Sequence, residues 1–290
     1  MSILALALIL VSAVCHASWN YLAQSSRDKF AFSWAFSLVA SVLYLPVALY
    51  FGLTANLTTE AWLFILGTIL LHAVYFYALN QAYTHGDLSL TYPIARGSGM
   101  MLVPLLAAVA LDERISLQGA LAILIILAGI FVAHQRGGIG TWLANSKRAL
   151  GERGTRYALL TGLTIACYSV WDKHGVSLSP APFYAYFIFL SWLLLGGIDV
   201  LIRRRPALRF MFAEQKRQIV AAGVLAPLAY GLVLTALTFS RVSYVAPARE
   251  LGVVIGAVMG IVIGGEPHGR NRIVGASLIA AGVFALALAP

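Results

Sequence analysis

Long runs of apolar residues recur along the whole chain, separated by short polar segments. Each run is about as long as the roughly twenty residues that an α-helix needs to cross the hydrocarbon core of a bilayer. The runs are too long for the strands of a membrane barrel, and they lack the alternation of apolar and polar residues that such strands show. The predicted spans cover residues 3–23, 30–52, 60–83, 88–110, 115–133, 156–175, 182–202, 217–239, 243–264 and 271–289.

Composition supports an all-α integral membrane protein with ten transmembrane helices. Hydrophobic residues make up 60% of the chain and charged residues 11%, far from the averages of soluble domains. The ten spans use most of the 290 residues, so we expect no catalytic ectodomain. The first apolar run has no positively charged segment before it, so we expect it to remain as the first helix rather than to be removed as a signal peptide.

The positive charges are distributed unevenly between the loops. The net charge is +9, and of the 20 Lys and Arg residues fifteen lie in or beside the loops that follow odd-numbered spans. Only Arg114, Lys173 and Arg241 follow even-numbered spans. Because cytoplasmic loops carry the excess of Lys and Arg, we expect a multi-pass protein of the inner (plasma) membrane with both termini outside the cytoplasm. The charge thus indicates contact with membrane lipids, as for the basic loop "RRRPALRF", and no nucleic-acid partner.

The chain contains an internal repeat. "CHASWN", which begins at Cys15, aligns with "CYSVWD" at an offset of 152 residues, and "YPIARGSG" aligns with "VAPARELG" at 153, matching Arg96 to Arg249. Glu113 matches Glu266 at the same offset, and both are expected at helix ends rather than at a binding site. The two halves are therefore residues 1–150 and 151–290. An odd number of spans in each half makes the second half inverted, an arrangement common in secondary transporters.

The repeated motifs give the chain a family resemblance. With "ASWNYLA" in the first span, "HGDLSLTYPIARG" entering the fourth, "LDERIS" after it and "GASLIAAGVFAL" in the last, it resembles the drug/metabolite transporter superfamily, in the ten-helix branch with two EamA-type repeats. The resemblance implies two inverted five-helix repeats around a central cavity lined by the fourth and ninth helices. It also implies transport without an ATPase.

Arg96 is the most informative single residue, because the run from Leu88 to Leu111 carries no other charge. An arginine at the centre of a membrane helix costs roughly 2.5–3.5 kcal/mol, so Arg96 is expected either to face a cavity or to be held by backbone carbonyls. A guanidinium offers a fork of donors to a carboxylate or phosphonate, with Arg249 as its weaker counterpart. Glu250 could neutralise Arg249, bind a substrate amine or carry a coupling proton.

Further polar side chains lie within the first, third and sixth spans. His16 and Asn20 are four residues apart and therefore share a helix face, although aromatic residues near span ends also form interfacial belts. The third span is unusually polar, which indicates a wet, aromatic-lined face. The predicted substrate-binding residues are Arg96, Arg249, Asn20, Trp19, His16, Tyr77, Asn80, Gln81, Tyr168 and Glu250.

These features favour a secondary transporter, an exporter or exchanger of small polar metabolites such as amino acids or other anionic or zwitterionic solutes, working by alternating access. A passive channel or facilitator is the alternative, and a membrane-embedded enzyme acting on lipid-linked phosphate is a third. An enzyme would need a nucleophile–base pair at one membrane face, and the charges are not so arranged. The six histidines are scattered, without the spacing of a metal or nucleotide motif, so we expect no catalytic residue, metal or cofactor. We expect a monomer.

Overall fold

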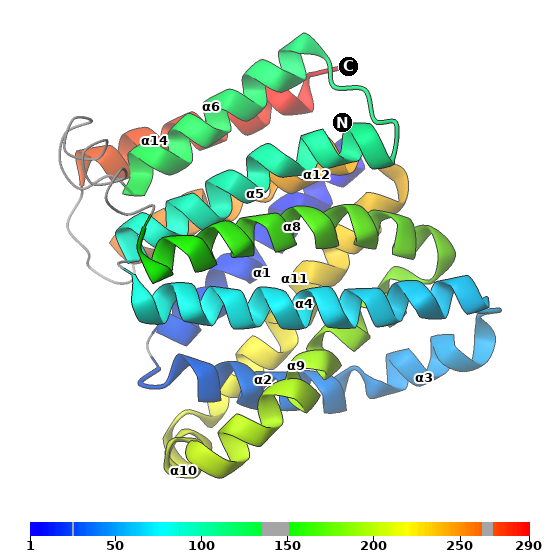
Figure 1. Cartoon of the computed structure of the whole chain (residues 1–290), viewed down its shortest axis with the longest axis vertical. Helices are drawn as coiled ribbons and strands as arrows, with labels where there is room; N and C mark the ends of the chain where they lie inside the picture. Colours follow the sequence, from blue (N-terminus) through cyan, green and yellow to red (C-terminus); the bar gives the residue numbers. More distant parts are fainter. Residues whose placement is uncertain (25, 87, 135–150, 263–268) are drawn as a thin grey trace. The chain divides into compact units, whose positions relative to one another are not determined.

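The computed structural model describes residues 1–290 except 25, 87, 135–150 and 263–268. The described part of the chain is helical and contains no strand, as the sequence predicts (Figure 1). Its helices are α1 (Ile3–Gln24), α2 (Lys29–Leu43), α3 (Leu45–Thr54), α4 (Thr59–His85), α5 (Leu88–Ala110), α6 (Leu117–His134), α8 (Arg153–Leu178), α9 (Ala181–Arg203), α10 (Arg205–Glu214), α11 (Lys216–Phe239), α12 (Val242–Ala248), α13 (Leu251–Val262) and α14 (Arg270–Ala287).

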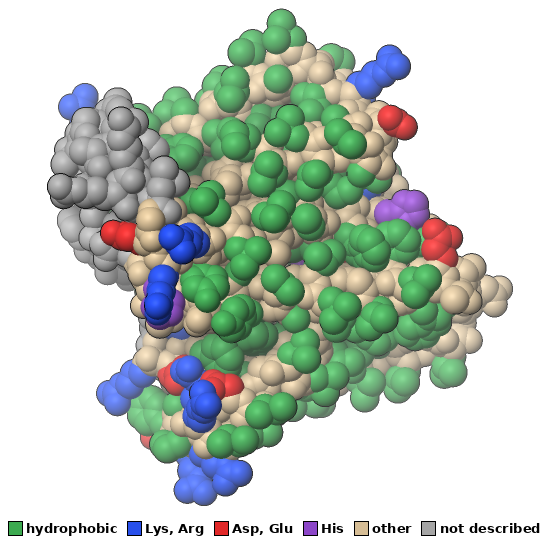
Figure 2. Space-filling view, in the orientation of Figure 1, with side chains coloured by type: hydrophobic (Ala, Val, Ile, Leu, Met, Phe, Trp, Pro, Cys, Tyr) green, Lys and Arg blue, Asp and Glu red, His purple; other side chains and the backbone are tan. Residues whose placement is uncertain are grey.

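The described helices confirm a multi-pass membrane protein. Eight stretches are long and apolar enough to cross a membrane, or nine if α2 and α3 form one bent span. Large apolar side chains face outward along them, as expected for helices in lipid; Val109 is 86% and Ile198 72% exposed (Figure 2). Helix α8 has 26 residues but includes Arg153, Asp172 and Lys173, and it is not among these apolar stretches. Length and composition therefore do not establish all ten predicted spans.

Three local features differ from the predicted spans. The second span is two helices, α2 and α3, which meet at Tyr44 with a bend of 48°. Pro46 lies in the first turn of α3, where its missing N–H does no harm and it can start a new helix. The ninth span, Val242–Val262, is a single apolar stretch, but a turn at Arg249 and Glu250 interrupts its helix and separates α12 from α13. The basic stretch after α9, expected to be a loop, forms the short helix α10.

The chain packs into two compact units, each with residues from both sequence halves. Unit 1 contains Met1–Leu6, Val74–Val170 and Ser240–Pro290, and unit 2 contains Ala7–Ala73 and Trp171–Phe239. The units are groups of residues that pack together, whereas the predicted halves are repeats in the sequence. The units therefore do not test the predicted boundary at residue 150.

In unit 1, α6 and α14 lie side by side along most of their lengths and run in opposite directions (Figure 1). A side-chain carbon placed on Gly129 would lie 2.7 Å from Ile279 Cγ1, and one placed on Gly282 would lie 2.7 Å from Ile126 Cγ1. Gly129 and Gly282 are 153 residues apart, and so are Ile126 and Ile279. The two contacts are therefore equivalent under the sequence repeat, and the pair of helices has local two-fold symmetry.

In unit 2, α2, α9 and α11 pack together. Side chains with N–H and O–H groups form hydrogen bonds between these helices. Trp34 Nε1 donates to Leu193 O at 2.8 Å, and Tyr44 OH donates to Val224 O at 2.9 Å. Trp192 Nε1 donates to Ser33 Oγ at 2.9 Å. Such bonds satisfy polar groups that lipid could not.

Candidate functional site

Arg96 is paired with a carboxylate from the other half of the sequence. It lies on α5, and its guanidinium forms an ion pair with Glu250, which follows α12 in the chain. Glu250 is fully buried and the Arg96 side chain is only 14% exposed. Among the possibilities left open for Glu250, the structure thus shows an ionic partner, but this partner is Arg96 rather than the adjacent Arg249. Charged residues inside membrane spans commonly pair with one another in this way.

Glu250 reaches Arg96 from a break in the ninth span. The N–H of Glu250 bonds to Pro247 O at 3.1 Å, the N–H of Gly252 to Arg249 O at 3.0 Å, and the N–H of Val253 to Glu250 O at 2.9 Å. These bonds connect residues three apart, so the turn is tighter than an α-helix. Irregular backbone at membrane depth is tolerated where protein or a cavity surrounds it, and in transporters it commonly marks binding sites.

Three tyrosines accompany the ion pair in unit 1. Tyr75 on α4, Tyr92 on α5 and Tyr168 on α8 are close enough to the Arg96 guanidinium to interact with it electrostatically. The Tyr75 and Tyr168 rings meet edge to face with centroids 5.4 Å apart. Arg249 is half-buried and interacts electrostatically with Tyr75. Of the predicted residues, the structure therefore brings together Arg96, Glu250 and Tyr168, with Arg249 nearby.

The ion pair leaves hydrogen-bonding capacity unused. Arg96 Nε and Glu250 Oε2 are both buried, and neither has a hydrogen-bond partner among the described residues. Buried polar atoms of folded proteins normally have partners, because an unmade bond costs about 1–3 kcal/mol. One donor and one acceptor thus remain at the same ion pair, and together they could hold a ligand with one anionic and one cationic group.

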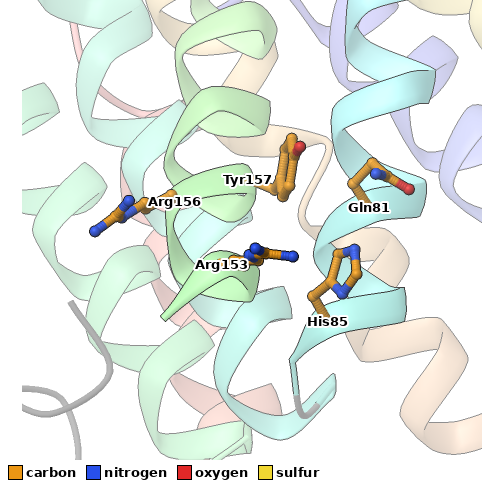
Figure 3. A pocket seen from close by; sticks show the side chains of 5 residues that line it. All are labelled: Gln81, His85, Arg153, Arg156 and Tyr157. Carbon is orange, nitrogen blue, oxygen red and sulfur yellow. The ribbon is translucent and has the colours of Figure 1, made fainter. Parts of the chain in front are cut away.

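The predicted residues of α4 do not join this centre through any hydrogen bond recorded in the described chain. Tyr77 is 57% exposed, and the amide of Asn80 donates to Phe76 O of its own helix at 3.0 Å. The Gln81 amide lies 3.5 Å from Tyr77 OH, at the limit of a hydrogen bond. Gln81 also lines a pocket with His85, Arg153, Arg156 and Tyr157 (Figure 3).

The predicted residues of α1 lie in unit 2. The Asn20 amide donates to His16 O at 2.8 Å, so its partner is its own helix. The His16 and Trp19 rings meet edge to face at 5.2 Å, and Trp19 packs against Phe36 at 5.4 Å. Within unit 2 these contacts are those of a packed helix surface, and the role of the three residues in binding stays a prediction.

Unit 2 contains a buried polar cluster that the sequence analysis did not assign to a site. Asp172 on α8 is fully buried, and its carboxylate accepts from Thr68 Oγ1 at 2.7 Å, Tyr184 OH at 3.0 Å and Tyr230 OH at 2.6 Å. His72 Nε2 lies 3.9 Å from the same carboxylate. Four helices, α4, α8, α9 and α11, therefore converge on one side chain. The sequence feature that could have indicated this cluster is Asp172 itself, an acidic residue inside an apolar span that aligns with Asn20 in the repeat.

Glu113 occupies a helix end, as expected. Its two carboxylate oxygens accept from the backbone N–H groups of Val242 and Ser243 at 2.8 and 2.9 Å, which are the first residues of α12. This is the arrangement of a helix cap supplied from a distant part of the chain. Its repeat counterpart, Glu266, lies outside the described residues. Within the described ranges, no three His, Cys, Asp or Glu residues are grouped as a metal site would require.

Comparison with known proteins places the chain in a family. A model of the EamA-like transporter family matches residues 3–134 and again residues 153–288. A solved structure described only as "Crystal structure of protein" superimposes with a TM-score of 0.72 and 15% identity, covering 98% of this chain and 97% of that chain. At this identity the likeness shows a shared fold alone. None of the curated proteins compared with the chain matches it. Because the family model covers most of the chain in two repeats, the protein belongs to the EamA-like transporter family of the drug/metabolite transporter superfamily, and is a membrane transporter by family rather than an enzyme.

Proposed function

We propose that the protein is a secondary transporter of small zwitterionic metabolites, with amino acids as the representative class. In this proposal Arg96 binds the substrate carboxylate and Glu250 binds its ammonium group. The observation that carries the proposal is the buried Arg96–Glu250 pair, which retains one donor, Arg96 Nε, and one acceptor, Glu250 Oε2.

Charge balance favours a zwitterion over a simple anion. The buried pair is neutral as a whole, and a zwitterion adds no net charge to the centre when it binds. A purely anionic substrate would add one negative charge beside Glu250, which is fully buried, and an uncompensated charge in a low-dielectric environment is costly. The phenols of Tyr75, Tyr92 and Tyr168 supply neutral surfaces around the guanidinium, suited to a small side chain on the substrate.

The transport cycle proposed is alternating access by two inverted five-helix halves, residues 1–150 and 151–290, that enclose a central cavity. All ten predicted spans are needed for this arrangement. The distribution of Lys and Arg supports an inner-membrane location with both termini outside the cytoplasm. We further propose that the protein works as an exporter or exchanger, that it is a monomer and that it needs no cofactor.

Counterflow in proteoliposomes tests the substrate class. Vesicles preloaded with an unlabelled neutral amino acid should accumulate the labelled amino acid, but neither its N-acetyl derivative, which lacks the ammonium, nor its amide, which lacks the carboxylate. Arg96→Lys keeps the charge but loses the planar fork, so counterflow should fall severely while the protein still folds. Arg204→Lys, at an ion pair with Asp28 outside this centre, is the matched control. Equal counterflow of the N-acetyl derivative would rule out the zwitterion.

A further inference from the structure

A positively charged pocket lies in unit 1, between the end of α4 and the start of α8. It has a volume of about 350 Å³ and is lined by Gln81, His85, Arg153, Arg156 and Tyr157. In Figure 3 the Arg153 side chain extends from α8 toward His85 on α4, and the Tyr157 ring lies above them. Each lining side chain can donate a hydrogen bond, and none is acidic.

The backbone around this pocket is held tightly. A side-chain carbon on Gly154 would lie 2.6 Å from the Cα of Gly86, so the end of α4 and the start of α8 touch directly. The Tyr157 ring is nearly parallel to that of His85, with centroids 6.2 Å apart, and nearly perpendicular to that of Tyr77 at the same separation. The backbone and the aromatic wall of the pocket are therefore in place without a ligand, which lowers the entropic cost of ordering them on binding.

The two arginines are available to an anion. In the described part of the chain neither Arg153 nor Arg156 forms an ion pair, and both are exposed. The adjacent acidic residue, Glu152, is also exposed and does not line the pocket. Guanidinium groups bind phosphate through two parallel hydrogen bonds, so a phosphate-bearing ligand matches the chemistry of this pocket.

The surroundings of the pocket favour a phospholipid over a free phosphate ion. One turn along α8, Leu159 and Leu160 are 43% and 37% exposed, and one turn back along α4, Tyr77 is 57% exposed. Apolar surface thus continues from the cationic pocket along both helices. A free phosphate has nothing to place on that surface, whereas a lipid has acyl chains. The fifteen-to-three charge distribution also assigns the adjoining loops to the cytoplasmic side, where anionic lipids are enriched.

We propose that this pocket binds the headgroup of an anionic phospholipid, with the phosphate on Arg153 and an acyl chain along Leu160 and Tyr77; the Arg156 side chain extends from the opposite side of α8 (Figure 3) and adds positive charge to the site. The site is separate from the Arg96–Glu250 pair and does not depend on the proposed transport substrate. In this proposal a membrane phospholipid binds to unit 1 through the side chains that line the pocket.

Native mass spectrometry of the delipidated full-length protein tests the site. Phosphatidylglycerol should bind in preference to phosphatidylcholine, and the double variant Arg153→Gln, Arg156→Gln should lose affinity about fivefold per arginine removed. The control Lys216→Gln, Arg217→Gln removes the same charge from exposed positions at the start of α11 and should leave the affinity near wild type. If both double variants lose the same affinity for phosphatidylglycerol, the lipid is attracted by general surface charge rather than by this pocket, and the proposed site is wrong.

Two further measurements separate the lipid from a free anion and from misfolding. Leu160→Gln should weaken phosphatidylglycerol binding but leave the binding of glycerol phosphate unchanged. If glycerol phosphate or inorganic phosphate binds as tightly as the lipid, the pocket is a free-anion site and the lipid proposal fails. Melting temperatures of all variants in detergent are measured in parallel. If the arginine double variant is unfolded, each single variant is measured alone, and unchanged binding in both singles overturns the proposal.

Discussion

Two buried charged centres in the described part of the chain, one in each unit, are built in opposite ways. In unit 1 Glu250 has a formal counter-ion, Arg96, yet one oxygen of the carboxylate and one nitrogen of the guanidinium have no partner among the described residues. In unit 2 Asp172 is held by three neutral hydroxyls, from Thr68, Tyr184 and Tyr230. The first centre balances charge but leaves two polar atoms without partners, whereas both carboxylate oxygens of the second accept hydrogen bonds and His72 lies 3.9 Å away.

This difference separates two uses of a buried charge. A carboxylate whose oxygens already accept hydrogen bonds from several helices has less capacity left for a ligand, and its loss removes bonds that hold those helices together. A pair with spare donor and acceptor capacity can exchange its mutual contact for contacts with a substrate. We therefore expect the Asp172 cluster to belong to the scaffold and the Arg96–Glu250 pair to binding, and three sets of variants test this expectation.

The largest change in stability is expected from breaking the ion pair on one side. Arg96→Ala leaves Glu250 buried without its counter-ion, which costs roughly 3–5 kcal/mol in comparable pairs, whereas Arg96→Ala combined with Glu250→Ala removes both charges and should recover most of that loss. Both variants should fail to transport. Unfolding in mixed micelles and counterflow are measured on the same preparations, and transport by the double variant would show that the pair only holds the fold.

A smaller loss is expected at Asp172. Asp172→Ala removes three hydrogen bonds, and at roughly 0.6–1 kcal/mol for each hydrogen bond in a membrane protein the free energy of unfolding should fall by about 2–3 kcal/mol. Asn20→Ala, at the aligned repeat position, loses only a bond to its own helix and serves as the control. Should Asp172→Ala unfold like wild type but lose counterflow, the cluster belongs to the transport machinery and the comparison fails.

The smallest effect is expected at a third carboxylate, Glu113, whose oxygens bond to the first N–H groups of α12. Glu113→Gln keeps one acceptor oxygen and should cost about 1 kcal/mol, as for the loss of other helix caps. Both oxygens of Glu113 already accept hydrogen bonds from α12, so we do not expect this carboxylate to bind substrate. The substrate concentration that gives half-maximal counterflow should therefore stay at the wild-type value. A large shift in that concentration in well-folded protein would place Glu113 near the substrate.

The sequence predicted the helices and several individual residues better than it predicted their partners. Apolar run length locates helices within a few residues because the bilayer fixes that length, and the repeat offset identified Arg96, Arg249 and Glu113. The Arg96–Glu250 pair was missed because Glu250 was placed on a continuous helix beside Arg249, whereas the structure breaks the span there. The Asp172 cluster was missed because its hydrogen-bond donors come from three other helices, and no local pattern relates them.

The packing of α6 against α14 has a consequence for how such a protein could arise. Gly129 meets Ile279 as Gly282 meets Ile126, between helices that run in opposite directions. A contact of this kind is self-complementary, so a single sequence can supply both sides, as in the interface of a two-fold homodimer. An ancestor one repeat long, inserted in both orientations, could have formed it between two copies before duplication joined them. After fusion, a substitution at Ile126 no longer changes Ile279 as well, which leaves the two sides free to diverge.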